Sequence, residues 1–127
     1  MADVGLDVEW RIIQGDDEFF GVTKTIHNAL QGDPQGLTKQ QEATFRRYNA
    51  LNAEQFEDDY DYVIVHDPQP AAMVDHFPDS DAHWIWRCHI DLSTPNQDVL
   101  GFLAPSLERY EAAIFHMPEY VPRHVAL

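Results

Sequence analysis

The residues of this sequence that could do chemistry follow short apolar runs. Three of four such runs end at a histidine, and two of these histidines have an aspartate close behind, as in His66-Asp67, His89-Ile90-Asp91 and His116. Carboxylates accept hydrogen bonds from hydroxyl groups, while histidines and the nearby Arg87 donate hydrogen bonds or exchange protons near neutral pH. Together these groups suit a ligand that is rich in hydroxyls.

Two other interpretations of these histidines stay open. A histidine at the end of a strand is often solvated or caps a helix, so each one taken alone favours a structural role. Histidine and aspartate also ligate zinc or manganese. However, the sequence holds no HxH, HxxxH or CxxC spacing that would place two ligands on one rigid element. We therefore predict no metal site and no bound cofactor.

The apolar runs themselves predict four β-strands, because they are short and rich in β-branched and aromatic residues. They lie at residues 8–13, 62–65, 84–88 and 112–115. The run at 62–65 is continuously apolar, which predicts a strand that is buried on both faces.

Apolar residues at spacings of three and four predict helices between these strands. One covers residues 18–30, and a second begins at the capping box Thr38-Lys39-Gln40-Gln41 and runs for roughly 18 residues. A short helix is expected at 70–77, and another opens at Pro95-Asn96. Alternating strands and helices predict an α/β, Rossmann-like parallel sheet with helices on both faces. Ligands of such sheets bind beyond the carboxyl ends of the strands, where the histidines are expected.

Several other reactive or aromatic residues favour structural roles. Cys88 lies inside an apolar run and is expected to be a small core residue and not a nucleophile. Trp84 and Trp86 share one face of their strand and are expected to pack in the core. His76 and His83 flank a polar turn and are expected at the surface.

The composition limits the number of domains and the kinds of partner. A chain of 127 residues, 44% of them apolar, can bury one core, so residues 1–127 are treated as a single domain. Its net charge of −14 repels nucleic-acid phosphates and anionic lipids, which argues against nucleic-acid and membrane partners. One cysteine cannot form an internal disulfide, and no signal region or membrane-spanning run is visible. We expect a soluble, cytoplasmic protein.

Four separated motifs resemble the N-terminal half of the trehalose-synthesising glycosyltransferases. These are the nucleotide-sugar-dependent trehalose synthases and the related trehalose phosphorylases, which are retaining enzymes of the GT-B architecture. The motifs follow the order of the family and cover nearly the whole chain, at residues 8–20 (VEWRIIQGDDEFF), 63–70 (VIVHDPQP), 86–93 (WRCHIDLS) and 115–122 (FHMPEYVP). The resemblance implies a Rossmann-like domain that holds the acceptor sugar and faces a second, nucleotide-binding domain.

The resemblance also implies roles for individual residues. His89 matches the strand-end histidine that these enzymes place near the transferred sugar. Its expected catalytic role is to bond a donor-sugar hydroxyl or the reacting groups, and not to act as a nucleophile. Glucose or trehalose is the expected ligand. The other residues on the acceptor-side loops, or on the same expected edge, should bind substrate: His66, Asp67, Gln69, Arg87, Asp91 and His116.

The chain also departs from the family pattern. Relatives open with a strand, a glycine-rich loop and a helix, whereas Met1–Leu6 resembles the end of that helix. Their nucleotide-binding domain would follow Leu127. We therefore expect a truncated half of a GT-B fold that does not catalyse transfer alone, because a clamp on the leaving phosphate supplies much of the electrostatic stabilisation. A nucleotide-sugar donor is expected to bind only together with the missing domain.

The absent first strand predicts a further partner. That strand is central in a 3-2-1-4-5-6 order, so its loss leaves residues 8–13 and 62–65 to pair directly or leaves exposed edges. A second copy of the chain would cover such edges, and we expect a homodimer. The alternative to a piece of an enzyme is a non-catalytic sugar-binding or self-associating module derived from that domain.

Overall fold

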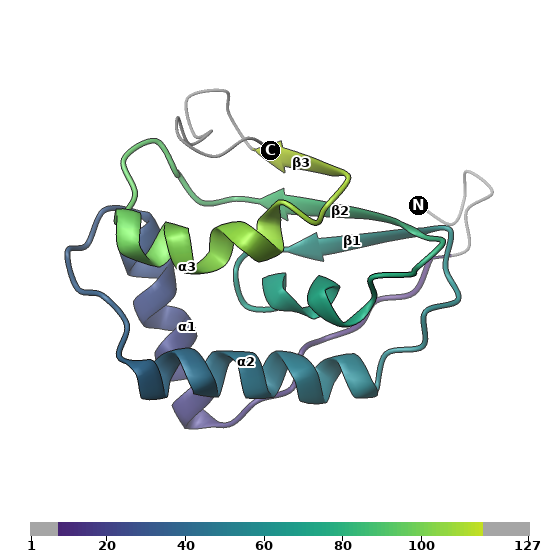
Figure 1. Cartoon of the computed structure of the whole chain (residues 1–127), viewed down its shortest axis with the longest axis horizontal. Coiled ribbons are helices and arrows are strands. Elements are labelled where there is room, and N and C mark those ends of the chain that lie inside the picture. The colour runs from purple at the N-terminus through teal and green to yellow at the C-terminus, as the bar shows by residue number, and fades with distance from the viewer. Residues whose placement is uncertain (1–7, 116–127) are drawn as a thin grey trace.

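The computed structural model describes residues 8–115, in which a small parallel sheet packs against helices (Figure 1). The elements follow one another in the order α1 (Asp17–Leu30), α2 (Lys39–Glu54), β1 (Tyr62–His66), η2 (Ala71–His76), β2 (His83–Cys88), α3 (Gln97–Leu107) and β3 (Ala112–Phe115). None of the helices in this range has the length and apolar character needed to cross a bilayer.

The strands form one sheet in the order β1-β2-β3, and both pairs are parallel. In register, Val65 lies opposite Trp86, and Trp86 lies opposite Ala113. A helical segment connects each strand to the next, as a parallel pair requires. The predicted α/β, Rossmann-like class is therefore confirmed.

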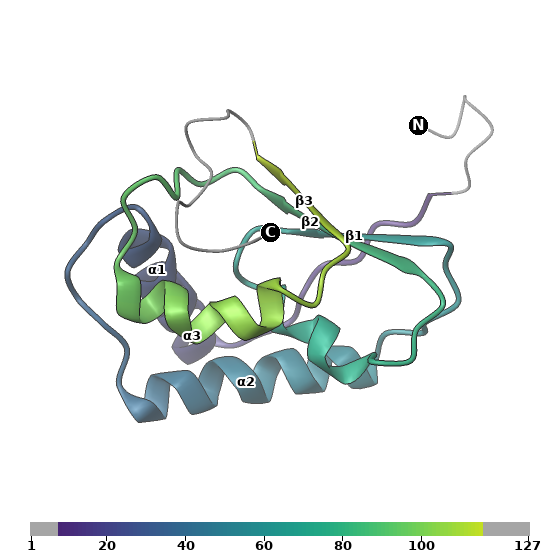
Figure 2. The same cartoon turned by 45° about the horizontal axis from the view of Figure 1, so that its top comes forward.

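The helices of the described residues gather on one side of the sheet (Figure 2), whereas the sequence predicts them on both faces. Burial alternates along β1 for this reason: Val63 and Val65 are buried, but Ile64 is 50% exposed. The prediction that this strand is buried on both faces is wrong. A continuous apolar run does not reveal whether a second layer covers the outer face.

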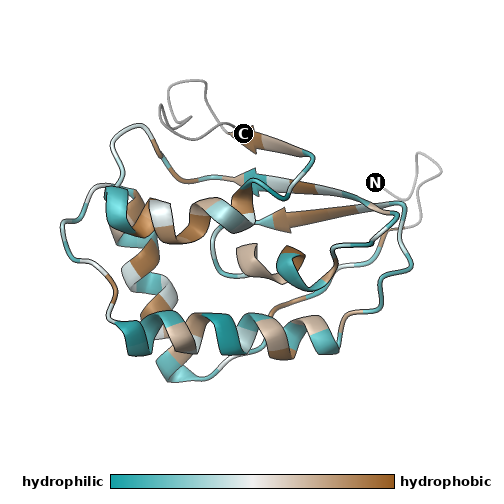
Figure 3. Ribbon diagram, viewed as in Figure 1, coloured by the Kyte–Doolittle hydropathy of each residue, from teal (hydrophilic) through white to brown (hydrophobic). Residues whose placement is uncertain are grey.

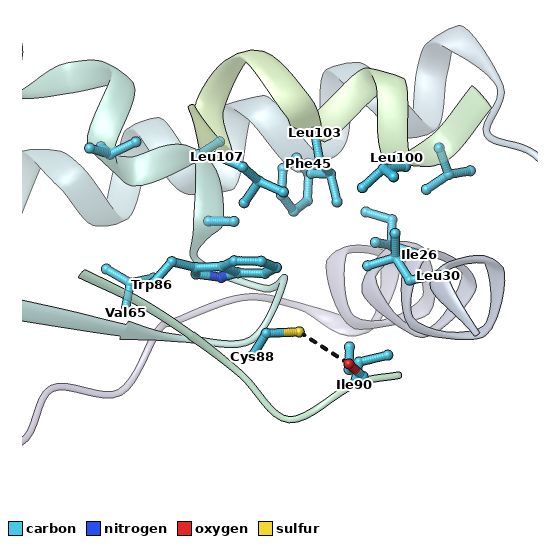
Figure 4. Close-up of a cluster of buried hydrophobic side chains, with 14 of the residues drawn as sticks. Ile26, Leu30, Phe45, Val65, Trp86, Cys88, Ile90, Leu100, Leu103 and Leu107 are labelled. Atoms are coloured by element: carbon cyan, nitrogen blue, oxygen red, sulfur yellow. Dashed lines mark hydrogen bonds between the residues drawn. The ribbon is translucent and has the colours of Figure 1, made fainter. Parts of the chain in front are cut away.

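The core lies between the inner face of the sheet and the helices, and Figure 3 shows hydrophobic residues along the strands and along α3. Trp86 is fully buried at its centre. Figure 4 shows its indole facing Leu103, Leu107 and Phe45, with Ile26 of α1 at the side. The predicted core positions of Trp84, Trp86 and Cys88 are confirmed.

Local capping signals set where the helices begin. Thr38 and Gln41 form the predicted capping box of α2, in which each side chain binds the backbone N–H of the other residue. Asn96 accepts hydrogen bonds from the first turn of α3, and Asp16 accepts one from the first turn of α1. The expected short helix at 70–77 is a 3₁₀ helix, η2.

Residues 8–13 do not form the predicted strand. The side chain of Asn52 binds both the N–H and the C=O of Gln14, so α2 holds the residue that directly follows this segment. Trp10 and Ile12 are left exposed. The residue types favour a strand, but strand formation also requires a neighbour to pair with. In the described part of the chain, β1 remains an edge strand instead.

Candidate functional site

The carboxyl ends of β1 and β2 bring together His66, Asp67 and His89, which we call the histidine rim. The two imidazole rings are nearly parallel, with centroids 6.0 Å apart and an interplanar angle of 11°. His89 Nδ1 lies 3.3 Å from Asp67 Oδ1. The sequence places these residues on one edge, and the structure places them in contact; their roles in binding stay predictions.

The backbone of Asp67 fixes the rim. Asp67 has a φ of 64°, in the left-handed region that aspartate tolerates better than most residues. Its N–H donates to the carbonyl of Arg87 (2.9 Å), and its own carbonyl accepts from the buried indole Nε1 of Trp86 (2.8 Å). Its Oδ1 also accepts from the N–H of His89 (2.8 Å). Asp67 therefore links the two strands and the core at one point.

Gln69 lies on the loop that follows β1, two residues after Asp67, and a hydrogen bond to its backbone carbonyl holds it there. Its carbonyl accepts a hydrogen bond of 3.0 Å from Nδ2 of Asn49, a fully buried residue of α2. The same Nδ2 donates to the carbonyl of Phe45, while Asn49 Oδ1 is buried without a partner among the described residues. Sequence reasoning missed Asn49, because an asparagine inside a helical pattern looks like a solvated position.

The remaining predicted residues are placed less directly. Arg87 is exposed and lies opposite His66 in the register of β1 and β2. Asp91 Oδ1 accepts from the hydroxyl and the N–H of Ser93, at 2.6 and 2.9 Å, and these bonds lower the pKa of its carboxyl. That oxygen is thus engaged in a local turn. His116 lies outside the described residues.

Trp10 is a neighbour of the rim that the sequence analysis did not single out. Its ring lies 6.1 Å from the ring of His66, with an interplanar angle of 28°. Because residues 8–13 were predicted to form a strand, and a tryptophan in a strand is expected to pack in the core, the exposure of Trp10 was not predicted. Its place in a segment that alternates apolar and charged residues was the available signal.

Cys88 is the last residue of β2, its side chain is buried on the inner face of the sheet, and it is not part of the rim. Burial raises the pKa of its thiol to about 12, so the thiol is protonated at neutral pH. Figure 4 shows the sulfur directed at the carbonyl of Ile90, at 3.6 Å. Within residues 8–115, no group of three or more histidine, cysteine or acidic side chains is placed to hold a metal ion.

A shallow cleft of about 330 Å³ opens at the opposite, amino-terminal end of β2 and β3. Its charged groups already have partners: Arg109 binds Asp75, and Glu111 binds His83. The cleft is lined by Val74, Phe77, Pro78, Ser80, Ala82, Trp84, Arg109 and Glu111.

Known sequences match nearly the whole chain. The family described as "Trehalose synthase, N-terminal domain" matches residues 1–122. A trehalose synthase of Thermococcus litoralis is 48% identical over 123 residues, which cover 95% of this chain and 30% of the relative. The trehalose synthase of Pyrococcus furiosus matches to the same extent. That of Rubrobacter xylanophilus is 45% identical over 131 residues, which cover 98% of this chain and 31% of the relative.

The matches cover nearly all of this chain but only part of each relative. The chain spans about 30% of the length of these relatives, and the matching family is their N-terminal domain. The motifs at residues 63–70 and 86–93, which carry the histidine rim, lie inside the matched range. The chain therefore belongs to the family of trehalose synthase N-terminal domains.

Proposed function

We propose that this domain is the acceptor-sugar side of a trehalose-forming glycosyltransferase and that the histidine rim contacts the sugar. The observation that carries the proposal is the contact of His66, Asp67 and His89 at the carboxyl ends of neighbouring parallel strands. Ligands of open α/β sheets bind at this edge. The names of the relatives supply the reaction, since all three are trehalose synthases.

The rim has the chemistry that a hexose requires. With His89 Nδ1 directed at Asp67 Oδ1, its Nε2 is the atom that meets a sugar hydroxyl. The bonds from His89 use Oδ1 of Asp67, so Oδ2 can accept from a second hydroxyl. Gln69 and Arg87 lie on the same two loops, and we propose that they extend the sugar contacts together with Asp91 and His116.

Transfer itself requires more than this rim. A nucleotide-sugar donor carries a diphosphate, and a chain with a net charge of −14 repels it. Cleavage of the donor also needs hydrogen-bond donors or cations on the leaving phosphate. We propose that a separate nucleotide-binding domain provides these groups, as the part of the relatives that this chain does not match could do. We also propose that residues 1–127 work in the cytoplasm. Residues 1–127 alone are expected to bind sugar without turnover.

Calorimetric titration with glucose and with trehalose tests the proposal. The wild-type chain should bind at least one of them, and His89→Ala should weaken binding about tenfold, as loss of one good hydrogen bond to a charged or polar partner does. His83→Ala is the matched control, because His83 lies at the other end of β2, is equally exposed and also pairs with a carboxylate. Equal affinity in wild type and His89→Ala would contradict the assignment.

A self-associating module is a second candidate, favoured by the outer face of the sheet. Ile64 and Ile114 are each about half exposed there, at 50% and 48%, and Tyr62 is exposed beside them. β1 is also an edge strand within residues 8–115. Exposed apolar faces and free strand edges favour association. We propose that a second copy of the chain covers this face and forms a homodimer.

Light scattering across a wide range of protein concentration tests this association. A dimer is expected for the wild type, and Ile64→Lys should shift it to monomer because the charge would be buried in the interface. Lys24→Glu is a suitable control, since Lys24 lies on α1, on the opposite side of the sheet. A wild-type monomer at all concentrations would exclude the homodimer.

A further inference from the structure

Trp10 lies beside His66, the residue of the histidine rim that also contacts the ring of His89. Its ring lies 6.1 Å from that of His66, which in turn lies 6.0 Å from that of His89. The three rings come from three separate segments, namely residues 8–13 and the ends of β1 and β2. The indole therefore belongs to the same surface as the polar groups of the rim.

The exposure of Trp10 separates it from the other tryptophans of the chain. Trp84 and Trp86 are buried in the core, whereas Trp10 is 78% exposed. Leaving so large an apolar side chain in water forgoes much of the stabilisation that its burial would give. The indole thus offers a broad apolar face that the described residues do not cover.

The segment on both sides of Trp10 is fastened to the domain. The hydroxyl of Tyr60 donates to Glu9 (2.5 Å) and accepts from Arg11 (3.4 Å), so Tyr60 binds both neighbours of the tryptophan. The Tyr60 ring packs on Phe56, with centroids 5.5 Å apart. These side-chain bonds restrain the segment that carries Trp10 without strand pairing, which limits the ordering cost when a ligand binds.

A pyranose presents two kinds of surface, which match the two kinds of group at this edge. One face of the ring carries C–H groups and packs on aromatic rings, whose faces are electron-rich. The hydroxyls point outward and bind polar side chains. We infer that Trp10 is the stacking platform for a pyranose whose hydroxyls bind the histidine rim, an inference that rests on the proposed function of the rim.

This assignment makes a distinction between ring sugars and open-chain polyols. Glucose has a rigid C–H face, whereas sorbitol has comparable hydroxyls on a flexible chain without such a face. A site that used hydrogen bonds alone would bind glucose and sorbitol with similar affinity. Stacking on Trp10 should therefore favour glucose over sorbitol.

Acrylamide quenching of tryptophan fluorescence tests the assignment on the whole chain. Because Trp84 and Trp86 are buried, Trp10 supplies most of the quenchable emission. Saturating glucose should protect wild-type emission from acrylamide, and the same concentration of sorbitol should not. Trp10→Ala should weaken glucose binding by calorimetry about tenfold, while Trp10→Phe, which keeps an aromatic face, should retain most of the affinity.

Ile12→Ala is the matched control, because Ile12 is as exposed as Trp10 and lies in the same segment; it should bind glucose like the wild type. Glucose binding that is equal in wild type and Trp10→Ala, without protection from acrylamide, would overturn the platform and leave the proposed function standing. Equal protection by sorbitol would also overturn it. A wild-type chain that binds neither glucose nor trehalose would overturn the proposed function and the platform together.

Discussion

The two ends of the sheet carry similar groups in different settings. At the amino-terminal end, His83 Nδ1 lies 2.7 Å from Glu111 Oε2, and the ring of Tyr62 lies 5.0 Å from that of His83. At the carboxyl end, His89 pairs with Asp67 at 3.3 Å beside the ring of His66. Each end thus has a histidine in β2 or directly after it, a carboxylate, and a ring from β1.

The difference lies in what holds the carboxylate. The side chains of His83 and Glu111 are 50% and 58% exposed, and a polar contact between side chains this exposed contributes about 0–1 kcal/mol. Asp67 is 30% exposed, and its backbone and side chain bind both strands and Trp86. The His83–Glu111 contact is shorter than the His89–Asp67 contact, yet its two side chains are held by fewer other bonds. The distance between two polar groups therefore identifies a site less well than the additional bonds that fix those groups.

Replacing the two carboxylates gives the largest expected contrast. Asp67→Ala should destabilise the domain by about 3 kcal/mol, because alanine tolerates a positive φ poorly and the N–H of His89 loses its acceptor. Glu111→Ala should cost less than about 1 kcal/mol. Urea denaturation measures both. Asp67→Asn, which keeps an oxygen acceptor and the turn, serves as control; similar losses for both alanine variants would remove the contrast.

The two buried tryptophans sharpen the comparison. Trp86→Phe removes the indole N–H that binds the carbonyl of Asp67, and Trp84→Phe removes the one that binds Ser80. Each should cost about 2 kcal/mol in denaturant unfolding, from lost volume and an unpaired acceptor. Only Trp86→Phe should also weaken glucose binding in calorimetry. Weaker binding in both variants would show that the ends are not independent.

Alkaline pH separates the two ends through their buried acids. Burial raises the pKa of Cys88 from 9.0 to about 12, so its contribution to stability is complete below pH 9 and is lost as the pH rises toward 12. Burial also raises the pKa of Tyr110 above 10.0, so its contribution declines only above pH 10. Between pH 9 and 10 the free energy of unfolding should fall by up to about 1.4 kcal/mol per pH unit.

Unfolding curves at several pH values assign this loss to one residue. Cys88→Ala should flatten the decline between pH 9 and 10, whereas Tyr110→Phe should leave it in place. A decline that persists unchanged in Cys88→Ala would mean that the thiol ionises as readily in the folded chain as in the unfolded one.

The smallest expected effect concerns the loop after β2. Hydrogen bonds from Ser93 lower the pKa of Asp91 below 3.8, so its contribution to stability is present above pH 3.8 and is lost as the pH falls through the lower folded-state value. Asp91→Asn should slightly flatten the acid dependence of unfolding. Asp16, whose pKa is lowered by the N–H of Phe19, keeps part of that dependence. An unchanged acid profile would argue that the turn forms without the charge.

Local signals were the predictable part of the fold. The capping box of Thr38 and Gln41 involves residues three apart, so the sequence holds all of its information. The strands that end at His66 and Cys88 were also predictable, because apolar runs and parallel topology fix which ends meet. The meeting of His66 and His89 at one edge follows from that topology and needed no further information.

Long-range bonds were the unpredictable part. Residues 8–13 have the composition of a strand, yet Asn52 holds the adjoining Gln14 from a helix. The positive φ of Asp67 is stabilised by Trp86 and His89, which are distant in the sequence. Residue types alone do not indicate hydrogen bonds between such distant residues. The sequence therefore predicted the edge of the sheet at which the rim lies, but not the bonds that fix Asp67 there.

Asn49 shows how a buried position outside the rim becomes intolerant of change. Its amide nitrogen joins two carbonyls of different segments, while its oxygen is enclosed without a donor. Aspartate would bring a negative charge beside two acceptors, leucine would leave the carbonyl of Gln69 without this donor, and alanine would open a cavity. Libraries of random variants should therefore be depleted at this position as strongly as at the rim, even when they are selected for folding alone.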